Sequence, residues 1–280
     1  MLPRSKLQHL ALVLVILVGL APVVYFVSVE IGSAEATQGN SDIPIMPTDS
    51  LERSIENLSF GVGEHLEFEV KYGFIAGGTA TMSVERLIEY ENRPCFLITT
   101  TAQSNSFFST FYKVDDHVES IVDANGLFSW RFEKNLNEGK YHAQRLITFD
   151  QHHQKAYYQK DTTNVPLFVQ DALSVFYYVR TQPLEVGKSI FVDHYNEGRL
   201  YRLEVQVLEK ETVTVAAGTF ECFVVEPLLQ SVGVFKHEGQ LKVWLTADRL
   251  RLPVLMKSKV LVGSISAELI DYKLGEIEVY

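Results

Sequence analysis

Apolar and polar residues alternate along much of the chain from about residue 60 onwards. In the first such stretch, Leu66, Phe68 and Val70 alternate with Glu67 and Glu69. Because successive side chains of a β-strand point to opposite faces, this alternation predicts a strand with one buried face. Similar stretches follow, and we expect strands at 79–90, 95–103, 111–122, 127–136, 141–149, 155–159, 189–194, 200–208, 212–216, 219–226, 240–246, 254–261 and 264–273.

Turn residues separate these stretches. Asn125-Gly126 lies between two extended runs and is a strong hairpin signal, and we expect Gly77-Gly78 to separate the first two strands. Short strands at regular spacing with turns between them are typical of an antiparallel meander. The pattern therefore predicts a mainly β domain built from a single antiparallel, strongly curved sheet, either a half-barrel or a closed barrel.

One stretch has helical periodicity instead. Between Asp171 and Arg180, apolar residues recur at helical spacing, and Leu173 and Tyr177 add a second apolar stripe. Asp171 is a suitable N-cap. A helix that is apolar on more than one side must be buried, so we expect it on the concave face of the sheet, where it lines or plugs an apolar cavity.

A hydrophobic segment precedes the β domain. Leu10 to Val29 carries no formal charge and follows the basic residues Arg4 and Lys6. Its 20 residues exceed a typical signal h-region and just reach the length of a membrane-spanning helix, and the small-residue site at 34–36 leaves cleavage open. We therefore expect residues 1–36 to be a signal peptide or signal anchor with a transmembrane helix at 10–29, residues 37–58 to be a flexible linker, and residues 59–280 to be a periplasmic domain. The domain would be anchored to the inner membrane, or cleaved and soluble as the alternative.

The charge balance narrows the choice of partners. The chain has 280 residues with 35 acidic and 25 basic side chains, a net charge of −10. Nucleic-acid binding requires clustered lysine and arginine, so we expect no nucleic-acid partner. The expected partners are the inner membrane, through residues 10–29, and a lipid or an envelope protein.

The sequence contains few candidates for chemistry. No G-x-S-x-G, phosphate-binding loop or zinc spacing occurs, so we expect no catalytic residues, metal or cofactor. Cys95 and Cys222 lie on different predicted strands, and in an oxidising compartment they are candidates for a disulfide. Aromatic residues gather before one strand and on the helix, and the candidate ligand-binding residues are Phe107, Phe111, Val175, Phe176 and Tyr177.

Several stretches resemble an uncharacterised bacterial envelope family, domain of unknown function 3108. They are Gly63–Phe68, Gln170–Arg180, Ala217–Cys222, Val243–Asp248 and Arg251–Val254. Together they span about residues 60–275, and the resemblance implies a periplasmic β domain without supplying catalytic residues. In architecture alone, the expected fold is more distantly similar to the periplasmic lipoprotein carriers, half-barrels that hold lipid beneath helices.

These observations favour one function and leave two alternatives open. The favoured function is a non-enzymatic exported envelope domain that binds an apolar ligand, a lipid or an envelope partner. The alternatives are a hydrolase with a dispersed active site and a structural envelope scaffold. An apolar cavity would favour the binding domain, and converging Ser, His and Asp side chains would favour the hydrolase. A filled interior would favour the structural scaffold.

Overall fold

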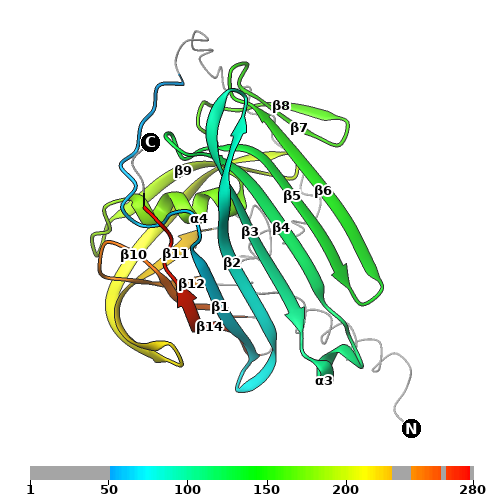
Figure 1. The fold of residues 1–280 in the computed structure, drawn as a ribbon, viewed down its shortest axis with the longest axis vertical. Coiled ribbons are helices and arrows are strands. Elements are labelled where there is room, and N and C mark those ends of the chain that lie inside the picture. The colour runs from blue at the N-terminus through cyan, green and yellow to red at the C-terminus, as the bar shows by residue number, and fades with distance from the viewer. Residues whose placement is uncertain (1–50, 229–240, 260–262, 278–280) are drawn as a thin grey trace.

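The fold is one large antiparallel sheet that curves around a single buried helix (Figure 1). A computed structural model describes residues 51–228, 241–259 and 263–277. Fourteen strands join into this sheet in the described residues, and the sheet is strongly curved but does not close into a barrel. The predicted mainly β fold class is therefore confirmed, in its open form. The hydrophobic segment at 10–29 lies outside the described residues.

The strands follow the predicted alternation closely. They are β1 (His65–Tyr72), β2 (Ile75–Tyr90), β3 (Arg93–Ser104), β4 (Asp115–Asp123), β5 (Ser129–Glu138), β6 (Tyr141–Asp150), β7 (Lys155–Tyr158), β8 (Asp161–Asn164), β9 (Ser189–Asn196), β10 (Arg199–Val215), β11 (Gly218–Leu228), β12 (Leu241–Thr246), β13 (Pro253–Lys259) and β14 (Ser264–Lys273). A four-residue helix, α3 (Ser106–Ser109), connects β3 to β4, and α4 (Ala172–Thr181) connects β8 to β9.

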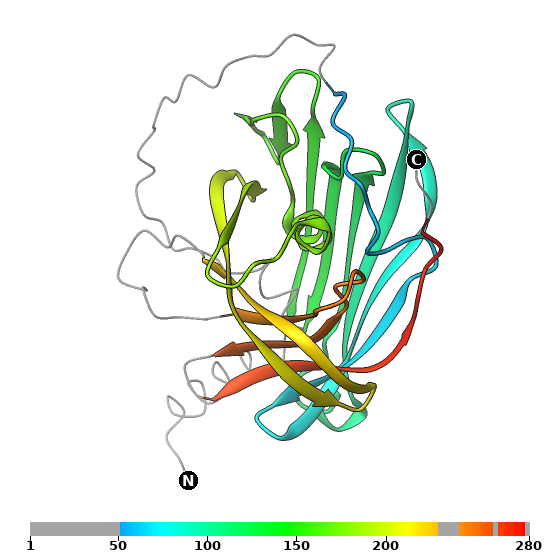
Figure 2. The ribbon, with the colours of Figure 1, turned by 90° about the vertical axis from the view of Figure 1, so that its left-hand side faces the viewer.

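The spatial order of the strands divides the sheet into two halves. The order is β8-β7-β6-β5-β4-β3-β2-β1-β14-β13-β12-β11-β10-β9, so the first and last strands pair in the middle. The two edges of the sheet, β8 and β9, are neighbours in the sequence on either side of α4. The sheet folds back on itself so that these edges approach each other around the helix (Figure 2).

Side chains, rather than a strand ladder, connect the two edges. The Tyr195 hydroxyl of β9 lies 3.3 Å from the Thr163 hydroxyl of β8, and its ring meets that of Phe149 edge-on at 5.8 Å. Nearby, Lys134 of β5 forms an ion pair with Glu197 in the β9–β10 turn. These contacts hold the curvature of the sheet without making it a closed barrel.

Helix α4 lies in the concavity, as the two apolar stripes predict. Asp171 is its N-cap, and the Asp171 carboxylate accepts hydrogen bonds from the backbone N–H groups of Leu173 and Ser174 at 2.7 and 2.8 Å. The Ser174 hydroxyl accepts a hydrogen bond from the Asp171 N–H at 2.9 Å, which completes a capping box. Because the cap satisfies the first amides, a helix of only ten residues can begin inside the core.

Several expected boundaries differ from the structure: the strand expected at 111–122 begins at Asp115, and those expected at 200–208 and 212–216 are one strand, β10. Gly77-Gly78 does not end a strand but lies within β2, and the turn comes earlier, at Gly73, whose φ is +60°. A Cβ on Gly78 would lie 2.0 Å from the carbonyl oxygen of Gln103, so this glycine permits close contact with β3 rather than a turn.

Part of the expected linker is held against the domain. Leu51 is buried in a cluster with Phe128 and Trp130. The Arg53 guanidinium donates hydrogen bonds to the carbonyl oxygens of Gly126 and Leu127, at 2.7 and 3.0 Å. Residues 51–58, at the end of the segment expected to be a flexible linker, therefore contact the domain.

Candidate functional site

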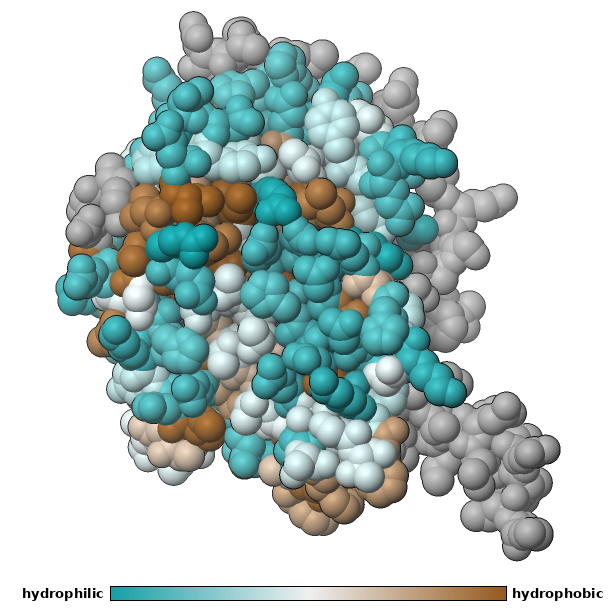
Figure 3. All heavy atoms as spheres, turned by 45° about the vertical axis from the view of Figure 1, so that its right-hand side comes forward, coloured by the Kyte–Doolittle hydropathy of each residue, from teal (hydrophilic) through white to brown (hydrophobic). Residues whose placement is uncertain are grey.

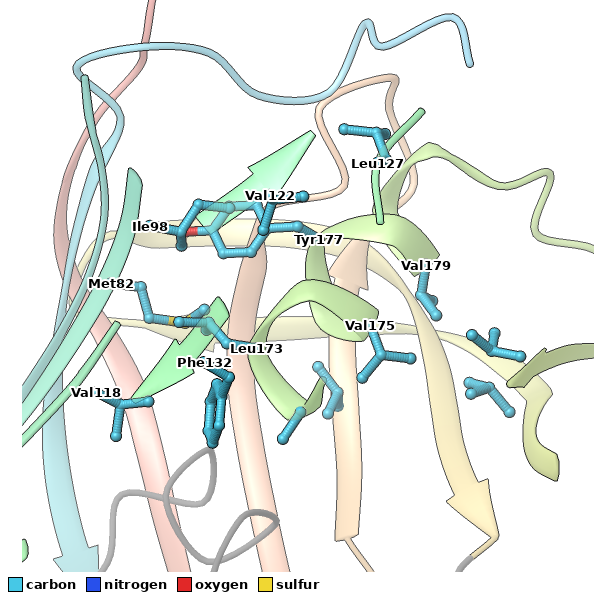
Figure 4. Packing of buried hydrophobic residues seen from close by; sticks show 14 of the residues in the cluster. Met82, Ile98, Val118, Val122, Leu127, Phe132, Leu173, Val175, Tyr177 and Val179 are labelled. Atoms are coloured by element: carbon cyan, nitrogen blue, oxygen red, sulfur yellow. The ribbon is translucent and has the colours of Figure 1, made fainter. Parts of the chain in front are cut away.

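Helix α4 presents different side chains to the two halves of the sheet (Figure 4). Leu173 and Tyr177 point towards the β2–β5 half, where the packing is filled by side chains such as Met82 and Val118. Val175 and Val179 point towards the opposite half. The two stripes of the helix therefore have different environments, one in a filled core and the other beside a cavity.

The cavity lies between α4 and strands β10–β13. Its volume is about 50 Å³. All of its lining side chains are apolar: Ala172, Val175, Phe176 and Val179 from the helix, and Leu203, Val205, Val225, Pro227, Leu241, Val243, Leu245 and Met256 from the strands. Phe176 and Pro227 are only half-buried, whereas the other lining residues are buried. With no polar group to bind water, such a space is suited to an apolar guest.

Buried hydrogen bonds fix the N-terminal end of the helix. Besides capping the helix, the Asp171 carboxylate accepts hydrogen bonds from Ser120 of β4, at 2.6 Å, and from Ser129 of β5. Burial raises the pKa of Asp171, and its four hydrogen-bond donors oppose this shift. The cap therefore joins α4 to two neighbouring strands and sets the position of the cavity wall.

An ion pair fixes the C-terminal end of the helix. The Arg180 guanidinium makes two hydrogen bonds of 2.7 Å to the Glu64 carboxylate, and both side chains are inaccessible to solvent. It also donates to the carbonyl oxygens of Ser59, at 3.1 Å, and Leu250, at 3.2 Å. Three segments distant in the sequence therefore meet at the last turn of α4.

The structure separates the five residues expected to bind a ligand. Val175 and Phe176 line the cavity. Tyr177 faces the other way, where its ring meets Phe60 edge-on at 4.8 Å. Phe107 and Phe111 lie on and just after α3, at the end of the sheet, with 65% and 69% of their surface exposed. Of the five residues, the structure therefore brings only Val175 and Phe176 together at the cavity.

Most of the residues that form the cavity wall could not be identified from the sequence pattern. They come from inward-facing positions of β10–β13, such as Val205, Val243 and Met256. Their alternation with polar residues predicted burial, but it carries no information about which buried residues surround an empty space. The sequence signal that did lie at the site was the first apolar stripe of the helix, which includes Val175 and Phe176.

The expected disulfide is not formed. Cys95 and Cys222 are both free and buried. Cys95 packs in a cluster with Trp130, whereas Cys222 packs in a separate cluster with Trp244. Each thiol therefore occupies the space of a small core residue.

Serine, aspartate and histidine side chains do gather near the start of α4, in a buried setting. The hydroxyls of Ser120 and Ser129 donate to Asp171. His194 lies 3.2 Å from the carbonyl oxygen of Gln170, and burial lowers the pKa of His194 to about 4. Because these residues are at most 4% exposed, the cluster offers no route for a substrate, and it serves to anchor the helix.

Two further features are absent from the described ranges. Within them, no three His, Cys, Asp or Glu side chains are placed to hold a metal ion together. The helices α3 and α4 are also too short, or insufficiently apolar, to cross a membrane.

Three solved structures from bacteria were matched to this chain. A β-barrel-like protein of domain of unknown function DUF1849 from Brucella abortus has a TM-score of 0.50 at 11% identity, over 78% of this chain and 100% of that chain. A protein with a YmcC-like fold from Bacteroides fragilis has a TM-score of 0.29 at 15% identity, over 79% and 99%. A lipoprotein candidate from Parabacteroides distasonis has a TM-score of 0.33 at 10% identity, over 79% and 100%. The likeness to the Brucella protein shows the fold alone.

The sequence match is more specific than the structural likeness. None of the curated proteins compared with this chain matches it. The model of one family, described as proteins of unknown function, matches residues 67–270. The match includes the cavity and α4, but not Ser59 and Glu64, which contact Arg180. That match confirms the resemblance carried by the sequence motifs, and the chain belongs to the DUF3108 family of proteins of unknown function.

Proposed function

We propose that this domain is a non-catalytic binding module of the cell envelope, which holds an apolar group in the cavity beneath α4. The observation that carries the proposal is the lining of that cavity, because all twelve side chains are apolar. Transfer of an apolar group from water into such a site is favourable, at roughly 25 cal/mol per Å² of apolar surface buried. The absence of polar lining side chains gives selectivity for a guest without hydrogen-bonding groups.

The size of the cavity limits what it can hold. Its volume of about 50 Å³ is well below the roughly 150 Å³ of an engineered protein cavity that binds benzene. The cavity as described suits the end of an acyl chain or another small apolar group, rather than a whole lipid. Met256, with an unbranched side chain, and Phe176, which is half-buried, are the lining residues best able to move for a larger guest.

The proposed location outside the cytoplasm is supported by the sequence. Arg4 and Lys6 precede the uncharged segment from Leu10 to Val29, a pattern that keeps the N-terminus in the cytoplasm and exports the rest of the chain. A domain tethered between two membranes would meet lipids and lipid-bearing proteins, whose acyl chains have the chemistry of the cavity. Reporter fusions placed after Gly39 test this location, and activity of a cytoplasm-only reporter there would exclude it.

The binding proposal is tested by changing the cavity at one position. Val243 is buried in β12 and lines the cavity. The variant Val243→Phe should fill the space, whereas Val243→Ala should enlarge it. Xenon is a suitable first probe, because it enters dry apolar cavities and needs no polar contacts. In the wild type, we expect xenon to shift the methyl resonances of Val175 and Val205, and we expect a larger response in Val243→Ala and none in Val243→Phe.

A matched control separates cavity effects from a general loss of stability. Val122 is also buried against α4, on the opposite side of the helix, so Val122→Ala removes the same atoms without changing the cavity. This variant should bind xenon as the wild type does. Organic extracts of purified wild type and Val243→Phe are then compared by mass spectrometry for apolar molecules. Equal xenon responses in all variants, with no apolar molecule in any extract, would refute the proposal and leave a structural scaffold.

A further inference from the structure

Three loops at one end of the sheet form a surface that the cavity does not explain. We call residues 73–77, 105–114 and 139–141 the rim loops. They contain the β1–β2 turn, the connection through α3 and the β5–β6 turn, and they lie together at the lower end of the molecule in Figure 1.

Backbone hydrogen bonds hold the rim loops together. The Asn105 N–H donates to the carbonyl oxygen of Gly77 at 2.9 Å, and the Asn105 side-chain amide donates to that of Ala76 at 2.8 Å. The Gly139 N–H donates to the carbonyl oxygen of Lys113 at 2.7 Å. The three loops therefore form one ordered surface rather than three independent tips.

Large apolar side chains project from these loops into solvent. Phe74 is 93% exposed, Phe107 65% and Phe111 69%, and Ile75 and Tyr141 are each nearly half exposed. Phe107 and Phe111 contact each other edge-on, with ring centroids 5.6 Å apart. Figure 3 shows apolar side chains at this lower end of the molecule, and another apolar patch higher on the same face, with hydrophilic side chains between them. Exposed apolar residues concentrated in one place indicate an interaction surface.

The charge of the rim loops differs from that of the whole chain. Within residues 73–77, 105–114 and 139–141 there are two lysines, Lys113 and Lys140, and no acidic residue, whereas the chain as a whole has a net charge of −10. Both lysines are exposed. Lys113 lies 3.5 Å from the Asp115 carboxylate in an exposed ion pair. Such a pair is weak, so the Lys113 ammonium can exchange this partner for another anion.

We propose that the rim loops dock the domain onto the surface of an anionic lipid bilayer. Phe74, Phe107 and Phe111 enter the interfacial region, and Lys113 and Lys140 face the lipid phosphates. A bilayer fits better than a protein partner because the aromatic side chains project from separate turn tips instead of lining a groove. Apolar tips combined with lysines are the chemistry of interfacial membrane binding, since each type of side chain meets its own layer of the bilayer.

The chain outside the described residues is compatible with this orientation. At about 3.3–3.6 Å per residue, residues 30–50 can extend up to ~70 Å between the hydrophobic segment and the domain. This reach allows the rim loops to face the membrane in which residues 10–29 would be anchored. The proposal rests on the rim loops and not on the cavity, so either proposal can fail without the other.

Tryptophan fluorescence in vesicles tests the docking. The full-length chain is reconstituted into vesicles of phosphatidylcholine and phosphatidylglycerol, with or without brominated acyl chains, as the variants Phe74→Trp and Phe107→Trp. Bromine quenches only nearby tryptophans, so we expect the brominated lipid to quench the emission that each substitution adds over wild type. The native Trp130 and Trp244 are buried and supply the baseline.

An exposed aromatic residue on another part of the sheet is the matched control. Tyr157 is 42% exposed. Its strand, β7, lies at the end of the molecule opposite α3 (Figure 1), so emission added by Tyr157→Trp should not be quenched. Combining Lys113→Gln with Lys140→Gln in the Phe107→Trp background should reduce quenching in anionic vesicles and leave it unchanged in neutral ones. Unquenched emission at positions 74 and 107, or equal quenching at position 157, overturns the proposal. Emission that changes with protein concentration but is not quenched would instead indicate self-association through the rim loops.

Discussion

Replacement of Arg180 tests whether the buried ion pair fixes the end of α4. The substitution Arg180→Met keeps an unbranched side chain of similar length and removes the guanidinium. The Glu64 carboxylate then stays in the core without its two hydrogen bonds of 2.7 Å. The carbonyl oxygens of Ser59 and Leu250 lose a donor as well. We therefore expect a large loss of stability from a change that alters side-chain volume little.

The expected size of the loss follows from burial. Removal of one partner of a buried ion pair costs about 3–5 kcal/mol, because the remaining charge has no compensation. Both side chains of this pair are at most 1% exposed, so the full range applies. A typical domain has a free energy of unfolding of about 5–15 kcal/mol, so Arg180→Met should remove a large fraction of the total.

Urea unfolding with two comparison variants gives the decisive measurement. Arg202 forms an ion pair of 2.9 Å with Asp193, but the two side chains are 60% and 32% exposed. The same substitution there, Arg202→Met, should cost less than about 1 kcal/mol. The double variant Glu64→Leu with Arg180→Met removes the buried charge too, so it should be more stable than Arg180→Met alone.

The double variant should not recover fully. The two backbone carbonyls still lack their donor, and an unsatisfied buried polar group costs about 1–3 kcal/mol. The reasoning is wrong if Arg180→Met and Arg202→Met lose similar amounts of stability. It is also wrong if the double variant is less stable than Arg180→Met.

Two further predictions concern ionisable groups in the domain. Burial raises the pKa of Cys95 to about 12 and that of Cys222 to about 11, so neither thiol should react with a thiol reagent at pH 8 while the protein is folded. Both thiols should react once the protein is unfolded. Fewer than two reactive thiols in the unfolded protein would contradict the free state of the cysteines. Burial, together with the charge of Asp116, raises the pKa of Glu138 from 4.5 to about 7. Between pH 4.5 and about 7 the folded state therefore keeps a proton that the unfolded state releases, so the stability of the domain falls as the pH rises through this range. The substitution Glu138→Gln should raise the melting temperature more at pH 8 than at pH 4. Equal shifts at both pH values would contradict this assignment.

Periodicity predicted the fold well where burial alone decides the structure. Leu66 and Phe68 face the core as their alternation with glutamates requires, and Asp171 caps the predicted helix. Glycine was less informative, because its roles in turns and in close strand contacts look alike in a sequence. Gly73 supplies a turn with positive φ, whereas Gly78 leaves room for the backbone of β3. Only the partner strand distinguishes the two roles.

The candidate site was only partly predictable, because a cavity is a property of packing between distant segments. Phe176 and Tyr177 are adjacent and both aromatic, yet one lines the cavity and the other fills the core on the opposite side. Phe107 and Phe111 are residues of a type that is usually buried in a core. However, the helix that carries Phe107 has four residues and no buried side chain. Hydrophobicity predicts which residues avoid water in general, and an exposed interaction surface is the exception to that rule.

The pairing of β1 with β14 has a consequence for how the domain is made. These strands form the central ladder, in which Tyr72 lies opposite Ile265 and His65 opposite Lys273. A ribosome or a translocation channel releases β1 first and β14 last, so the middle of the sheet is the last part that can assemble. Until then, β1 has an unpaired side that can join a strand of another chain. Such long-range pairing slows folding, so the unpaired side of β1 stays open to association until β14 arrives.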